Sequence, residues 1–265
     1  MSTTFPPRTL LLLAALAGGA ALPAQASTIL YSGFGDSTVG ATAPAGWTRV
    51  ANSGSASSTI TADHHFSQNA PSNGQNTLSL FNTGSGISRA AGDGFRLTST
   101  FSATSGSAQY ENTAFFFMAP SDGANAPRVN FNMGYSNTGL LEFSNVTTNV
   151  NDTFGGTAYN ALEPQNPIYT FTLTGIFQAN GNLNLTATLA NSVNSTVLTS
   201  TGTLNAASAT GTYFGIRTAA GGEGSGHAAS SVHRSYLLEA IPEPSSAMLL
   251  LGGAMATLAR RRRRG

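Results

Sequence analysis

The chain of 265 residues contains no cysteine and no lysine, and charged residues make up only 9% of it. Without cysteine there is no disulfide, no thiolate nucleophile and no cysteine-ligated zinc, so a buried core must hold the fold. An average soluble domain carries about 25% charged residues. Since nucleic acids are bound largely through lysine and arginine contacts to phosphate, we expect no nucleic-acid partner.

The few positive charges are concentrated at the C-terminal end. Of the twelve arginines, Arg8 lies near the start, and five form a run at the other end: Arg260, Arg261, Arg262, Arg263 and Arg264. Residues 27–240 contain six arginines against ten acidic residues, which is a net charge of −4. The calculated pI of about 8.1 therefore reflects the termini, and the intervening chain is mildly acidic.

Residues 1–26 have the pattern of a secretory signal peptide. Arg8 precedes the apolar run 10–22, and Ala24 and Ala26 occupy the small-residue positions of a cleavage site. We expect export and cleavage after Ala26. The alternative is a retained membrane anchor, for which the apolar run is short.

The C-terminal residues 241–265, IPEPSSAMLLLGGAMATLARRRRRG, combine three elements. Residues 245–259 are uncharged and would span about 22 Å as a helix, which is short for a hydrocarbon core of about 30 Å. The five arginines at 260–264 are expected to stop translocation and stay cytoplasmic. Pro242 and Pro244 flank Glu243 and favour an extended, accessible peptide.

Pro242-Glu243-Pro244, the apolar segment and the terminal arginines resemble the PEP-CTERM sorting signal of Gram-negative bacteria. The resemblance implies an exosortase-type transpeptidase and the secretion machinery as partners, with a transient stay in the inner membrane. It also implies a final place at the cell surface or outside the cell, and an association with exopolysaccharide. Glu243 would then be a recognised residue and not a catalyst. The alternative is an ordinary tail anchor.

The chain between these ends shows the period-two alternation of half-buried strands. The continuous apolar run 114–120 predicts a strand buried on both faces, and Asn180-Gly181 predicts a two-residue type I′ hairpin turn. The alternating positions expected to point inward are Phe95, Leu97, Ser99 and Phe101, then Tyr169, Phe171 and Leu173, then Leu183, Leu185, Ala187 and Leu189.

About a dozen such segments, with no linker or internal repeat between them, predict a single β domain over residues 27–240. The predicted fold class is all-β, a single β-sandwich or jelly roll. An N-terminal signal helix and a short C-terminal transmembrane helix are expected to flank it.

Residues 29–50 and 211–240 are similar to the first and last strands of concanavalin-A-like, laminin-G-like jelly rolls. They read ILYSGFGDSTVGATAPAGWTRV and GTYFGIRTAAGGEGSGHAASSVHRSYLLEA. The resemblance implies that the two ends of the domain pair and that Trp47 packs inside the sandwich. Many such domains carry Asp-Asn in the closing strand, where this chain has Ser235-Tyr236. A calcium or sugar site of the family is therefore not carried over.

Two histidine-containing segments are weak candidates for a metal site. Adjacent residues of a strand point to opposite faces, so Asp63-His64-His65 is expected to form an exposed loop and not a chelate. In the glycine-rich segment 221–227 and the strand after it, Glu223, His227 and His233 offer a weak cation site as an alternative to a plain loop. We predict no metal and no cofactor.

Catalytic patterns are absent from the sequence. Glu111, Glu142 and Glu163 are isolated, whereas glycoside hydrolysis needs paired carboxylates. We predict no catalytic residue and no enzyme activity. Tyr110 and Tyr135 are candidate glycan contacts.

The expected function is that of an exported surface or extracellular-matrix protein associated with exopolysaccharide and biofilm. One alternative is a lectin-like glycan-binding module, which needs aromatic side chains exposed on a concave sheet. The second alternative is a polysaccharide hydrolase, which needs two converging carboxylates.

Overall fold

The computed structural model describes residues 26–105, 111–133, 139–154, 167–193, 195–221 and 228–243. Every element in these residues is a β-strand, and all strand pairs are antiparallel. Residues 27–243 form one compact unit. The Tyr110, Tyr135 and Glu163 positions, the expected signal helix and the expected helix 245–259 lie outside the described residues.

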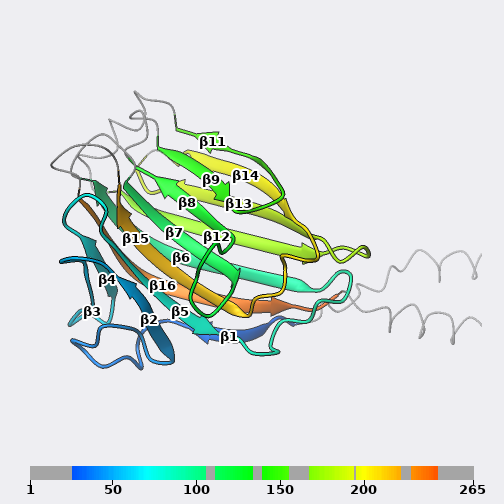
Figure 1. The fold of residues 1–265 in the computed structure, drawn as a ribbon, viewed down its shortest axis with the longest axis horizontal. Helices are drawn as coiled ribbons and strands as arrows, with labels where there is room; N and C mark the ends of the chain where they lie inside the picture. The colour runs from blue at the N-terminus through cyan, green and yellow to red at the C-terminus, as the bar shows by residue number, and fades with distance from the viewer. Residues whose placement is uncertain are drawn as a thin grey trace, which may run out of the picture. The chain divides into compact units, whose positions relative to one another are not determined.

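The strands form two sheets that pack face to face (Figure 1). Across the nine-stranded back sheet they are β10 (Thr148–Val150), β14 (Val197–Leu204), β13 (Leu183–Asn191), β12 (Ile168–Phe177), β6 (Gly94–Ser105), β16 (Ala229–Ile241), β4 (Phe66–Ala70) and β3 (Ser57–Ile60), with β1 (Thr28–Ser32) also paired to β16. Across the seven-stranded front sheet they are β11 (Asp152–Thr153), β9 (Leu140–Ser144), β8 (Arg128–Asn132), β7 (Glu111–Ala119), β15 (Tyr213–Ala220), β5 (Asn76–Asn82) and β2 (Trp47–Asn52).

The core lies between the sheets, where the alternating apolar positions of both meet. All the positions predicted to point inward on β6, β12 and β13 are buried. Phe115 of the front sheet stacks on Phe171 of the back sheet with ring centroids 4.0 Å apart. Residues Ala114–Ala119 of β7 are buried on both faces, as the continuous apolar run predicted.

The two ends of the domain meet in the back sheet. β1 pairs with the last strand β16, with Thr28 opposite Ala240. Trp47 is 7% exposed and its ring lies 4.9 Å from that of Tyr236 in an edge-on arrangement. Both features were expected from the jelly-roll resemblance, and the structure confirms them.

The turn between β12 and β13 differs from the prediction. A type I′ turn needs positive φ at both central residues, but in this turn only Gly181 has positive φ, at 79°. The amide of Gly181 donates to the carbonyl of Gln178, and the amide of Gln178 donates to the carbonyl of Asn182. The loop therefore has three residues and ends in a left-handed glycine, so the Asn-Gly pair lies one position later in the turn than predicted.

Candidate functional site: the outer face of the back sheet and the sorting motif

Threonine side chains cover the outer face of the back sheet. Strand pairing places them in rows across neighbouring strands: Thr172 lies between Thr98 and Thr188, and Thr188 lies beside Thr199. On β6, β12, β13 and β14 these residues alternate with inward-facing positions, so their hydroxyl groups face away from the core. Thr148 of β10 lies on the same face because it pairs with Thr203. The threonines of this face are Thr98, Thr100 and Thr104 of β6, Thr170, Thr172 and Thr174 of β12, Thr186 and Thr188 of β13, Thr199, Thr201 and Thr203 of β14, Thr148 of β10, and Thr59 of β3.

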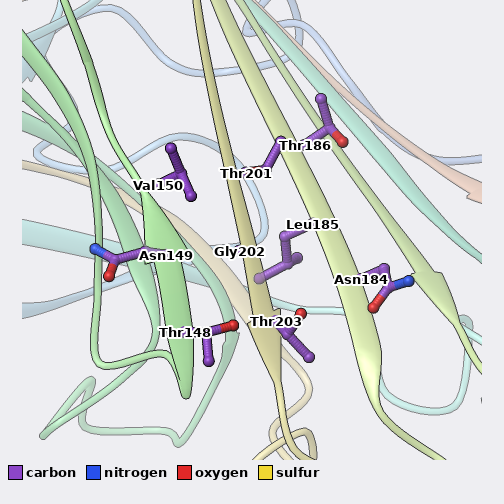
Figure 2. A pocket seen from close by; sticks show the side chains of 9 residues that line it. All are labelled: Thr148, Asn149, Val150, Asn184, Leu185, Thr186, Thr201, Gly202 and Thr203. Atoms are coloured by element: carbon purple, nitrogen blue, oxygen red, sulfur yellow. The ribbon is translucent and has the colours of Figure 1, made fainter.

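A groove of about 340 Å³ is hollowed into this face near the sheet edge. Figure 2 shows β14 in the middle, with side chains from β10 on one side and from β13 on the other. None of the nine lining residues is charged. They are Thr148, Asn149, Val150, Asn184, Leu185, Thr186, Thr201, Gly202 and Thr203. We call this hollow the threonine groove.

Each row of the threonine groove pairs residues of all three strands. Thr203 lies between Asn184 and Thr148, and Thr201 lies between Thr186 and Val150. Val150 is 69% exposed, so the groove also offers an apolar contact. A surface of this kind can exchange hydrogen bonds in both directions, because a hydroxyl donates and accepts and a carboxamide does both.

The outer face of the front sheet carries a second polar cluster around Phe116. The side-chain amides of Asn130 and Asn132 donate to Oε1 of Glu142 at 3.2 and 2.7 Å. Arg128 and Arg217 lie over the Phe116 ring, with their guanidinium carbons 5.9 and 5.6 Å from its centroid. Asn130, Asn132 and Phe116 are buried, so this cluster is mainly a packed part of the domain.

Burial lowers the pKa values of the two arginines of this front cluster. It lowers the pKa of Arg217 to about 10, and the neighbouring charge of Arg128 adds to this lowering. Burial also lowers the pKa of Arg128, against the opposing effect of Glu142. Both arginines keep their charge at neutral pH, since even a pKa of about 10 lies far above it.

A further hollow of about 290 Å³ lies among the loops that follow β7, β9 and β14. Three of its lining residues, Met118, Asn125 and Asn145, have positive φ values of 47°, 49° and 57°. The side-chain amide of Asn145 donates to the carbonyl of Ala126 at 3.1 Å, which ties two of these loops together.

The start of the sorting motif lies directly against the domain. β16 ends at Ile241, opposite Gly94, and the backbone amide of Glu243 donates to Oδ1 of Asp93. Gly92 has φ 90°, and a Cβ at this position would come within 2.6 Å of the Glu243 side chain. Only Pro242 separates the paired strand from the docked Glu243.

The structure places only some of the residues singled out at the two ends of the sequence. Ala26, Pro242 and Glu243 are described, whereas Ala24 and Pro244 lie outside the described residues. The arginines expected to stop translocation also lie outside them, so their role stays a prediction: Arg260, Arg261, Arg262, Arg263 and Arg264.

The candidate residues within the domain are placed in part as well. Glu142 belongs to the front cluster. The two tyrosines offered as glycan contacts, Tyr110 and Tyr135, lie outside the described residues. Glu111 is the first residue of β7, and its side chain lies outside what the structure describes.

The histidines do not form a metal site within the described residues, where no group of three His, Asp or Glu side chains comes together. His64 is exposed in the turn between β3 and β4 with φ 55°. Glu223 and His227, from the glycine-rich segment, lie outside the described part of the chain.

His233, offered as a weak cation ligand, is instead completely buried. Burial lowers its pKa to about 3. Sequence reasoning missed this core role because the alternation of β16 is interrupted by a bulge between His233 and Ser235.

Sequence reasoning also missed the threonine groove. The signal was present as the Thr-x-Thr spacing of residues 170–174, 186–188 and 199–203. Alternation shows that such residues share a face of their own strand, but the sequence does not say which strands are neighbours.

No helix in the described part of the chain has the length and apolar character needed to cross a membrane.

The comparisons with known proteins concern the C-terminus and the fold. The PEP-CTERM protein-sorting motif matches residues 240–264. No protein of curated function matches the chain in sequence.

Several plant lectins share the fold. Lectin II from Ulex europaeus superposes with a TM-score of 0.51 at 10% identity, covering 80% of this chain and 98% of the lectin. Lectin I from the same plant, solved with the methyl glycoside of α-L-fucose, gives 0.51 at 12% identity and covers 79% and 96%. A Lotus tetragonolobus seed lectin gives 0.50 at 9% identity and covers 81% and 98%.

At these identities the likeness establishes the fold alone. The protein is thus an exported protein that carries a PEP-CTERM protein-sorting motif at residues 240–264, and its strands form a legume-lectin-like, concanavalin-A-like jelly roll.

Proposed function

We propose that the protein is a non-catalytic component of the cell surface or extracellular matrix of a Gram-negative bacterium, associated with exopolysaccharide. The observation that carries the proposal is the sorting motif at residues 240–264, which continues directly from the last strand of the domain. In this proposal an exosortase-type transpeptidase recognises Pro242-Glu243-Pro244 and releases the jelly roll from a transient stay in the inner membrane.

The absence of catalysis is part of the proposal and has physical support. Glycoside hydrolysis uses two carboxylates about 5 to 9.5 Å apart. Among the described side chains of the front cluster, Glu142 is the one carboxylate, and it accepts hydrogen bonds from Asn130 and Asn132. Its partners hold it as a structural acceptor inside the sheet surface.

The sorting function predicts a change of location when Glu243 is replaced. In producing cells we expect the wild-type protein at the surface or in the medium, with a mass that lacks the C-terminal tail. Glu243→Ala should stay in the inner-membrane fraction with its tail intact. Immunoblots of cell fractions and intact-mass measurements check both outcomes.

The matched control for this experiment is Glu239→Ala, because Glu239 is the nearest acidic residue before the motif and pairs with Arg96 at 3.2 Å. This control should be sorted normally. Normal release of Glu243→Ala, or equal retention of both variants, would contradict the proposed recognition of Glu243.

A second candidate function is lectin-like binding of glycans. The observation that favours it is the threonine groove, which offers uncharged hydrogen-bonding groups on an exported jelly roll. Among the described residues, no large aromatic side chain is exposed. A glycan would therefore be held in the groove by hydrogen bonds and not by stacking.

A further inference from the structure

The lining of the threonine groove is uncharged and mostly polar. Four threonines and two asparagines line it, and no charged side chain does so. A hydroxyl group donates one hydrogen bond and accepts others, and an amide side chain does both. The ligand that fits such a lining carries closely spaced groups that also donate and accept, and carries no charge that would require a partner ion.

The spacing of the groups is set by the sheet. Neighbouring strands lie about 4.8 Å apart, and side chains two residues apart on one strand lie about 6.7 Å apart. The row Asn184, Thr203, Thr148 and the row Thr186, Thr201, Val150 run side by side across the three strands. A chain molecule lying along the first row therefore meets a polar side chain at each strand, and along the second row it meets two threonines and the apolar Val150.

The charges around the groove disfavour an acidic ligand. Asp152, two residues from Val150, accepts a hydrogen bond from the amide of Thr199 on β14 at 2.8 Å. In the row of Thr186 and Thr201, Arg96 already forms an ion pair with Glu239 at 3.2 Å. β12 lies between Arg96 and the strands that line the groove. Residues 27–240 as a whole carry a net charge of −4, so a polyanion would be repelled at long range.

We propose that the threonine groove binds a neutral polysaccharide whose chain lies across β10, β14 and β13. Thr148, Thr201, Thr203 and Asn184 exchange hydrogen bonds with its hydroxyl groups, and Val150 packs against the apolar face of a sugar ring. This proposal rests on the proposed association with exopolysaccharide and specifies both the site and the uncharged class of glycan.

The competing explanation is that threonine is simply a good strand former on a solvated face. The two explanations differ in where replacement matters. If the threonines serve only the strands, valine should be as good at every position of the face. If the groove binds glycan, hydroxyl loss should matter inside the groove and not elsewhere on the sheet.

The test uses the exported protein recovered from producing cells, in native gels containing dextran as a neutral probe or alginate as an acidic one, without calcium. Thr201→Val with Thr203→Val removes two hydroxyls from the groove while keeping side-chain shape and strand propensity. Thr170→Val with Thr172→Val is the matched control, since both lie on the same face of β12 outside the groove.

We expect dextran to retard the wild-type protein and the control equally, and the groove variant to bind roughly tenfold more weakly, as the loss of two hydrogen bonds implies. Alginate should retard none of them. Equal weakening in both variants, unchanged binding in the groove variant, or preference for alginate would overturn the proposal.

The producing organism's own exopolysaccharide is run in parallel. Binding to it that survives replacement of the groove threonines overturns the groove as the site and leaves the proposed function standing. No binding to any of these polysaccharides overturns both.

Discussion

At the residue scale, His233 shows how a polar side chain can belong to the core. Its Nε2 lies 3.1 Å from the hydroxyl of Ser231, which lies 2.6 Å from that of Thr218. Thr218 in turn donates to Oε1 of Gln68 at 3.1 Å. A neutral imidazole with its proton on Nε2 satisfies this chain of donors, which links the back sheet to the front sheet.

This buried histidine predicts a pH-dependent stability. Its pKa is about 6.5 in the unfolded chain and about 3 in the fold, so between these values only the unfolded state takes up the proton. The contribution of His233 to the free energy of unfolding is therefore complete above about pH 6.5 and is lost progressively as the pH is lowered below it. We expect a free energy of unfolding about 2 kcal/mol lower at about pH 5 than at about pH 7.5, measured by urea denaturation.

His233→Gln provides the control for this prediction. Glutamine keeps a donor and an acceptor but does not titrate, and the remaining histidines are common to both proteins. The variant should be less stable at neutral pH but should lack the loss on acidification. An equal loss in both proteins would show that His233 does not carry the effect.

At the element scale, β16 connects the fold to the sorting motif. It pairs with β6, β4 and β1, and its last residue is followed within two positions by the docked Glu243. Glu243 lies against Gly92 and Asp93, which belong to the turn between β5 and β6. The geometry makes the turn between β5 and β6 a neighbour of the sorting motif that no sequence pattern indicated.

This docking predicts different consequences for two glycine replacements. Gly92 and Gly40 both have positive φ, at 90° and 83°, so alanine at either should cost about 1 kcal/mol of stability. A Cβ at Gly40 meets nothing within 4 Å, whereas one at Gly92 displaces the flexible Glu243 side chain. We expect faster amide hydrogen exchange at Glu243 in Gly92→Ala only, measured by NMR.

The outcome that would contradict the docking is unchanged exchange at Glu243 in Gly92→Ala. Asp93→Ala is a second variant for the same contact, because it removes the acceptor of the Glu243 amide. It should speed exchange at Glu243 without adding strain to the turn.

The sequence predicted strands and their inner faces well, because alternation depends only on neighbours along the chain. Phe95, Leu97 and Phe101 point inward as expected. It did not predict which strands lie side by side, and the threonine groove depends on the pairing of β10 with β14 and of β14 with β13. The three-residue turn at Gly181 was missed for a local reason, since an Asn-Gly pair fits more than one position of a turn.

At the scale of the whole molecule, an uncharged polar surface is combined with a signal for export. The chain has no cysteine, so its sandwich is held by an apolar core in which aromatic rings of the two sheets meet, as Phe115 does with Phe171. Its outer back face is covered by hydroxyl groups where many soluble proteins carry lysine and glutamate. A surface of this kind suits a protein that works among uncharged polysaccharide chains.

The most direct test of this account is co-sedimentation of the exported protein with the producing organism's own exopolysaccharide, with and without calcium. The account predicts saturable binding that does not depend on calcium, and no new reducing ends in the polymer. Absence of binding under both conditions would contradict the association with exopolysaccharide, and a release of reducing ends would contradict the absence of catalysis.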